Sequence, residues 1–117
     1  MDIHDITQYC LSKRDAYLYY PLGQSPAVVK VYDKMFALIF IRNDKPCLSL
    51  KCDPFVAKSL REQYPAVTPG YHLNKEHWNT IVIDGSVHDD EIVWRIDHSY
   101  ELVVRKIDEI KKEGNVF

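Results

Sequence analysis

The sequence predicts an α+β domain: an antiparallel sheet of about five strands with the N-terminal and C-terminal helices on one face. Apolar residues recur at three- and four-residue steps near both ends of the chain, whereas the middle holds short β-rich runs separated by turn residues. With 117 residues, the chain can build one hydrophobic core but not two. We therefore expect residues 1–117 to form a single domain with its helices gathered on one side of the sheet.

The N-terminal half predicts one helix followed by a meander of strands. Helical spacing of apolar side chains makes residues 2–13 an amphipathic helix. Residues 16–24 follow as extended chain that runs into a turn at Pro21-Leu22-Gly23. The β-rich runs are residues 28–32, 35–42 and 47–52. Because short turns separate them, these runs should pair as antiparallel neighbours.

The second half returns to helical periodicity. Asp53-Pro54 places an N-cap acceptor before a proline at the first helical position, so a helix should begin there and end at Pro65. Residues 71–75 and 77–83 are expected to form two further strands. The last helix should run over residues 89–113, with a break or bend near residues 97–99 where Ser99, or alternatively its neighbour Asp97, caps a new segment.

Alternation along the strands divides their side chains into a core face and a mixed face. The predicted core set is Val29, Val31, Phe36, Leu38, Phe40, Leu48, Leu50, Ile81 and Ile83. The mixed set is Lys30, Tyr32, Met35, Ala37, Ile39, Cys47, Ser49, Lys51, Trp78, Thr80 and Val82. Its lysines and aromatics suit a surface that binds phosphates and stacks on bases, although the solvated side of a one-layer sheet is the more ordinary explanation.

Composition favours a soluble cytoplasmic protein without a disulfide framework. The sequence has no run of 18 apolar residues, and its first residues lack the basic and apolar regions of a signal peptide. Cys10, Cys47 and Cys52 are an odd number without CxxC spacing, which predicts buried thiols. Net charge is −2, but residues 28–80 carry eight basic and five acidic side chains, whereas residues 81–117 carry five and nine. The middle segment is therefore the candidate for contact with an anionic partner.

Residues 69–80 carry the densest chemistry of the chain. One interpretation is structural: Asn side chains bond their own backbone, Trp78 closes the end of the core, and both Trp78 and Tyr71 are largely buried. The other is functional, with Lys75 and His77 contacting phosphate while Asn74 and Asn79 bond phosphate or base. A third use of this corner is to line a concave pocket for a protein or small ligand.

Four ordered blocks, at residues 29–38, 50–54, 64–80 and 97–103, resemble the signature blocks of the MmcQ/YjbR-like family of small bacterial proteins. The resemblance covers nearly the whole chain, with Pro21-Leu22-Gly23 standing where the family usually has Pro-Phe-Gly. It implies a fold similar to the frataxin (CyaY-like) α+β sandwich and a DNA-binding role through a double-wing arrangement of hairpins. Frataxin-like iron transport ranks lower, because the first helix offers only Asp2 and Asp5 where frataxins are associated with an acidic ridge.

No recognisable catalytic, metal or nucleotide-cofactor motif occurs. His72 and His77 would lie on opposite faces of a strand, and adjacent Asp97, His98 and Ser99 point apart on a helix. We therefore expect a monomeric, non-enzymatic protein without cofactor or metal that binds DNA weakly through its phosphates. The alternative is a protein-interaction or small-ligand domain that uses residues 71–80. The predicted DNA contacts are Lys30, Lys34, Lys51, Asn74, Lys75, His77 and Asn79.

Overall fold

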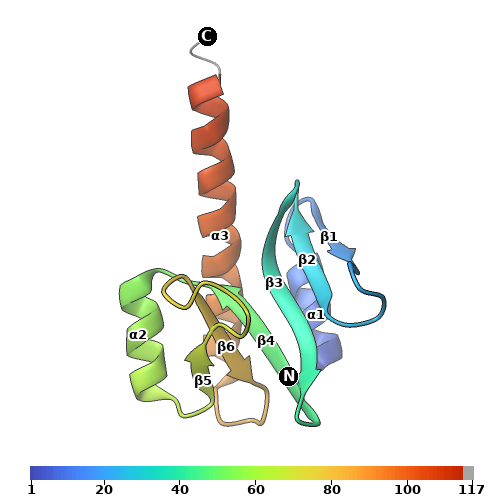
Figure 1. The fold of residues 1–117 in the computed structure, drawn as a ribbon, viewed down its shortest axis with the longest axis vertical. Coiled ribbons are helices and arrows are strands. Elements are labelled where there is room, and N and C mark those ends of the chain that lie inside the picture. Colours follow the sequence, from blue (N-terminus) through green and yellow to red (C-terminus); the bar gives the residue numbers. More distant parts are fainter. Residues whose placement is uncertain (115–117) are drawn as a thin grey trace.

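The protein is a single six-stranded antiparallel sheet with helices on one side (Figure 1). The computed structural model describes residues 1–114. In chain order the elements are α1 (Ile3–Leu11), β1 (Ala16–Tyr19), β2 (Ala27–Val31), β3 (Lys34–Arg42), β4 (Lys45–Lys51), α2 (Pro54–Gln63), β5 (Val67–Pro69), β6 (Trp78–Val82) and α3 (Asp89–Gly114). The strands lie in the order β1-β2-β3-β4-β6-β5. No helix in residues 1–114 is long and apolar enough to cross a bilayer.

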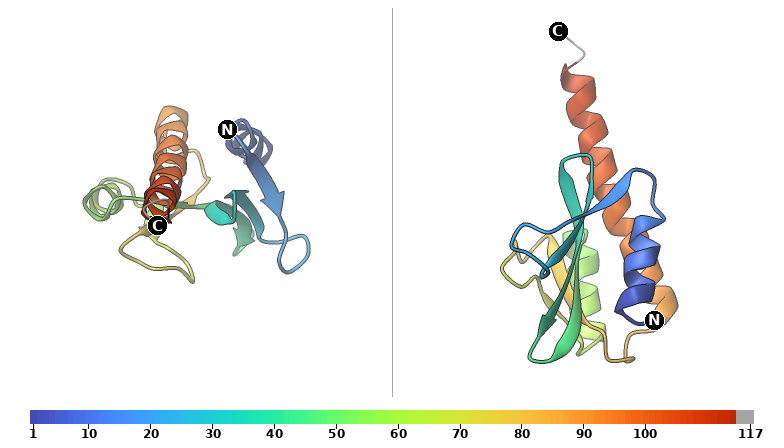
Figure 2. Two further views of the ribbon diagram at one scale, coloured as in Figure 1. Left: turned by 90° about the horizontal axis from the view of Figure 1, so that it is seen from above. Right: turned by 90° about the vertical axis from the view of Figure 1, so that its right-hand side faces the viewer.

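The N-terminal and C-terminal helices share one face of the sheet, as predicted. Figure 2 shows α1 and α3 on one side, whereas the loop over residues 70–77 lies on the other. The helices bury Ile6, Cys10, Ala57, Leu60, Ile96 and Val103 in one cluster with the inward side chains of the strands. α2 completes the helical layer at the β5–β6 edge, where Asp53 caps it by accepting the backbone N–H groups of Phe55 and Val56. The predicted start of this helix at Asp53-Pro54 is therefore confirmed.

The strand assignment differs from the prediction in two places. The extended chain after α1 pairs with β2 and forms a true edge strand, so the sheet has six strands instead of about five. The predicted strand over residues 71–75 is wrong: β5 forms the other edge of the sheet, and residues 71–77 form turns. Pro69 ends β5 at the sheet edge, where a proline removes no ladder hydrogen bond.

A β-bulge in β3 overturns part of the predicted core set. Val29 pairs with Ala37 but Lys30 pairs with Met35, so Phe36 is an extra residue in β3. The extra residue inverts the alternation that follows it. Ala37 and Ile39 therefore enter the core, whereas the predicted core residues Leu38 and Phe40 are only half-buried.

The last helix is continuous, and the predicted break near residues 97–99 is wrong. Ser99 caps nothing; its side chain is fully buried in the middle of α3. Its Oγ donates to the Phe36 carbonyl at 2.6 Å and accepts the Lys51 N–H at 2.9 Å. These two backbone groups lie just beyond the last β3–β4 pair on this side, Ala37 with Leu50. The serine thus satisfies polar groups that the sheet leaves unpaired.

The predicted burial of Trp78 is confirmed at 8% exposure, but Tyr71 is 37% exposed and so is not a core residue. All three cysteines are buried, as predicted. Burial raises the pKa of the Cys10 thiol to about 12, so this group is protonated at neutral pH.

Candidate nucleic-acid interface

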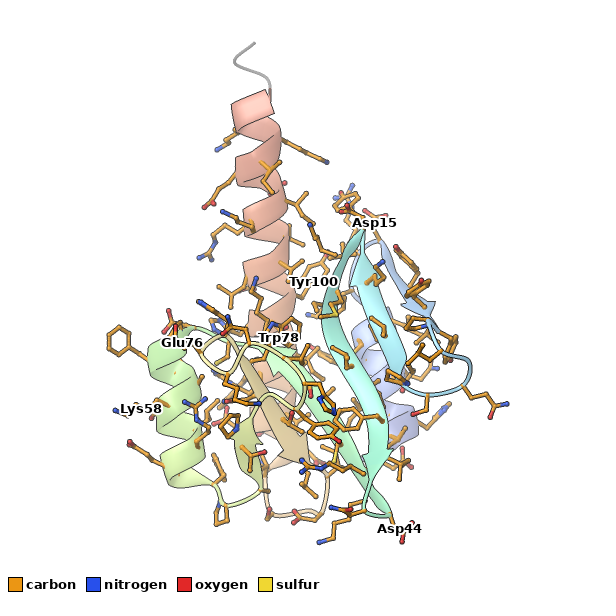
Figure 3. All side chains as sticks on the ribbon, viewed as in Figure 1. Asp15, Asp44, Lys58, Glu76, Trp78 and Tyr100 are labelled. Atoms are coloured by element: carbon orange, nitrogen blue, oxygen red, sulfur yellow. The ribbon has the colours of Figure 1, made fainter. Side chains whose placement is uncertain are left out.

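A hollow of about 290 Å³ opens where α3 runs past the end of the sheet. We call it the notch. Its lining consists of Lys34, Met35, Lys51, Trp78, Val103, Lys106, Ile107 and Ile110. In Figure 1 the upper half of α3 and the upper ends of β2 and β3 flank this place, and Figure 3 labels Trp78 near the point where α3 leaves the sheet. The lining residues include three lysines and no carboxylate.

Helix length explains why the notch exists. The 26 residues of α3 span about 39 Å, which is longer than any strand of the sheet, so the last turns project beyond it. The turn between β2 and β3 lies beside these projecting turns of the helix (Figure 1). There Tyr32 adopts a left-handed conformation with φ of 55°, and the Lys111 ammonium lies 4.5 Å from the centroid of its ring. This cation–π contact joins the projecting helix to the hairpin.

A second hollow of about 320 Å³ adjoins the notch, and we call it the side hollow. It shares Lys51 and Lys106 with the notch. The rest of its lining is Cys52, Asp53, Pro54, His77, Leu102, Arg105 and Glu109. The side hollow is thus lined by two lysines, one arginine and two carboxylates. All the charged residues that line the notch are lysines. Of the two, the notch is the better site for an anion.

The backbone of β4 that carries Lys51 is held by α3. Ser99 accepts the Lys51 N–H, and two residues further along the chain the Asp53 N–H donates to Nε2 of His98 at 3.2 Å. That acceptor must be unprotonated, and burial together with nearby Arg95 lowers the pKa of His98. The junction between β4 and α2 is thus positioned by two neighbouring side chains of the long helix.

Three of the predicted contact residues meet at these hollows. Lys34 and Lys51 line the notch, and His77 lines the side hollow. Two predicted cations lie elsewhere. The Lys30 ammonium lies 4.6 Å from the centroid of the Tyr19 ring, and the Lys75 ammonium donates to the Gly70 carbonyl at 3.0 Å. Neither of these lysines lines the notch or the side hollow.

The two predicted asparagine contacts make hydrogen bonds within the fold. Asn74 Oδ1 accepts the backbone N–H groups of Glu76 and His77, which is an Asx turn. Asn79 is 3% exposed; its Oδ1 accepts Arg61 at 2.8 Å and its Nδ2 donates to the Ala57 carbonyl. These hydrogen bonds support the interpretation that Asn74 and Asn79 stabilise the fold.

Tyr71, which also belongs to the corner at residues 70–77, makes contacts within the fold. The Tyr71 N–H donates to Thr80 Oγ1 at 3.0 Å, and the Tyr71 ring stacks on Phe40 with centroids 5.9 Å apart. Arg42 lies over the same ring at 4.1 Å. Together these contacts hold the loop on the sheet face opposite the helices (Figure 2).

Sequence analysis missed Arg105 and Lys106, which belong to the most acidic segment of the chain. Because residues 81–117 have a net negative charge, charge alone does not indicate this segment as a binding surface for an anion. At 100° per residue, Lys106 lies beside the apolar stripe of Val103 and Ile107, which are buried, whereas Arg105 lies nearly opposite that stripe. A position beside the stripe is the signal that could have identified Lys106. Among residues 1–114, no group of three or more His, Cys, Asp or Glu side chains is arranged to hold a metal ion.

A sequence model of the YjbR family matches residues 11–102. The uncharacterised protein YjbR of Escherichia coli is 36% identical over 113 residues, covering 97% of this chain and 96% of that protein. The crystal structure of Deinococcus radiodurans protein DR2400 has 36% identity and a TM-score of 0.83, covering 89% of this chain and 79% of that one.

A crystal structure of a Pseudomonas syringae protein has 30% identity and a TM-score of 0.76, covering 87% of this chain and 98% of that one. The family model spans most of the chain, and the Escherichia coli relative is matched almost from end to end. The resemblance seen in the four sequence blocks is thereby confirmed, and the chain belongs to the YjbR family.

Proposed function

We propose that the protein binds DNA weakly through its phosphates at the notch and carries out no chemistry on it. The observation that carries this proposal is the charge of the notch: Lys34, Lys51 and Lys106 line it, no carboxylate does, and only Lys106 has a carboxylate next to it, Glu109 at 3.8 Å. Phosphate contacts of this kind position a nucleic acid and carry no sequence information. We therefore expect little sequence preference.

The affinity should be low, because few cations converge. Three notch lysines with neighbouring Arg105 and Lys111 can neutralise only a few phosphates, while Asp53 and Glu109 line the adjoining side hollow. Non-specific binding of this type gives dissociation constants on the order of 10⁻⁴ to 10⁻⁶ M at physiological salt.

The alternative role, a protein-interaction or ligand-binding corner at residues 71–80, has weaker support. Such a site needs polar groups that are available to a partner. Here Asn74, Lys75 and Asn79 each make hydrogen bonds within the fold. His77 is exposed, but it faces the side hollow and so belongs with the basic surface.

Fluorescence anisotropy with a labelled DNA duplex, at about 50 and about 200 mM salt, tests the proposal. The informative variant is Lys34→Gln combined with Lys106→Gln. The matched control is Lys45→Gln with Lys58→Gln, which makes the same change in net charge at exposed positions outside both hollows. In Figure 3 the side chain of Lys58 points away from α2 into solvent.

The notch variant should bind at least about tenfold more weakly at low salt, and its salt slope should decrease by roughly two. The control should bind like the original protein apart from a small general effect of charge. Absence of binding at low salt with about 100 µM protein would refute the proposal. Equal weakening by the two double variants would show that the notch has no special role and would refute it as well.

A further inference from the structure

We propose that the notch takes an unpaired nucleotide, so that the protein prefers single-stranded DNA to duplex DNA. This inference rests on the proposed function and deepens it. Five of the eight residues that line the notch are apolar: Met35, Trp78, Val103, Ile107 and Ile110. A surface that contacts phosphates alone needs no apolar floor. An apolar floor with a cationic rim matches a nucleotide, which combines an aromatic base with a charged phosphate.

Exposed apolar groups extend from the notch to its opening. Ile110 is 50% exposed although it lines the notch, and Tyr32 is 47% exposed on the neighbouring hairpin turn. Lys111 follows Ile110 on α3 and lies over the Tyr32 ring, so the tyrosine stands beside the notch. Every base has a π-face that can stack on an aromatic ring, which makes this arrangement independent of sequence.

The size of the notch separates the two forms of DNA. At about 290 Å³ it lies at the lower limit of small-molecule pockets, with α3 and the β2–β3 hairpin on either side. A duplex keeps its bases stacked inside and offers phosphates and sugars to such a narrow opening. The phosphates of a duplex could contact the lysines at the rim of the notch, but its bases could not contact the apolar side chains of the floor. A single strand can turn one base onto that floor while its phosphates meet Lys34, Lys51 and Lys106.

Electrostatics alone would give the opposite preference. Duplex DNA carries the higher charge density and releases more counterions for each phosphate that a protein neutralises. A protein that reads only phosphates should therefore bind the duplex at least as well as the single strand. Preference for the single strand requires contact with the bases.

The experiment compares three labelled ligands of equal length in anisotropy titrations: a thymidine strand, a duplex, and an abasic strand with the same number of phosphates. The variant is Tyr32→Asn with Ile110→Gln, which removes two exposed apolar side chains and leaves the charge unchanged. Asparagine tolerates the left-handed backbone of residue 32. The control is Trp94→Gln, which removes an apolar side chain that is 58% exposed on α3 and does not line the notch.

We expect the thymidine strand to bind at least about fivefold more tightly than the abasic strand and more tightly than the duplex. The Tyr32→Asn, Ile110→Gln variant should lose this preference, whereas the Trp94→Gln control should keep it. Equal binding of thymidine and abasic strands, or tighter binding of the duplex, would overturn the inference. The proposed function would survive either of these results, provided that the Lys34→Gln, Lys106→Gln variant bound DNA more weakly than the original protein. Absence of binding to all three ligands would overturn both.

Discussion

Replacing Ser99 by alanine should destabilise the protein far more than its small size suggests. Its hydroxyl is completely buried in the middle of α3, where it joins the Phe36 carbonyl of β3 to the Lys51 N–H of β4. Alanine fits the same space without a cavity. The expected effect therefore arises from two backbone groups that lose the serine hydroxyl as a hydrogen-bond partner.

The magnitude follows from those two groups. A buried donor or acceptor left without a partner costs about 1–3 kcal/mol, so two cost about 2–6 kcal/mol. Alanine recovers roughly 0.5 kcal/mol through its higher helix propensity. Lys51 is only half-buried, so water can partly replace the serine at its N–H. We therefore expect the free energy of unfolding to fall by about 2–4 kcal/mol.

Urea denaturation followed by circular dichroism measures this change. The matched control is Ser59→Ala, because Ser59 is also in a helix interior but is exposed on α2. The control gains the same helix propensity without losing a bridge, so its stability should change by no more than about 0.5 kcal/mol. A loss below about 1 kcal/mol for Ser99→Ala would refute the bridging role.

Two further predictions concern the surroundings of the site. A Cβ on Gly70 would lie 2.6 Å from Trp78 Cβ and 3.1 Å from the Trp78 carbonyl oxygen, so Gly70→Ala should cost about 1–3 kcal/mol in urea denaturation; an unchanged midpoint would contradict it. His98 has a pKa below 6.5 in the fold, chiefly because of burial, so the unfolded chain binds the proton first and stability should fall as pH decreases through 6.5. Thermal denaturation from pH 8 to below pH 6.5 should show a smaller loss of stability with falling pH in His98→Gln than in the original protein. Equal dependence of the melting temperature on pH in the two proteins would contradict this prediction.

Local sequence determined the helices and the class of the fold. The cap at Asp53-Pro54 and the apolar spacing of residues 2–13 concern neighbours in the chain, so they could be read without the structure. The same holds for the buried thiols and for Trp78. Alternation along β3 failed at Phe36, because a bulge depends on how two strands pair and not on the residues of one strand alone.

The candidate site divides in the same way. Lys34, Lys51 and His77 could be selected from the sequence because they belong to a basic segment. Helical periodicity could have placed Lys106 beside the apolar stripe, but only a continuous α3 that packs across the sheet brings Arg105 and Lys106 to these hollows. The periodicity and capping of a helix are encoded within a few residues of each other. The meeting of distant side chains and the pairing of buried polar groups are decided only when the whole chain packs.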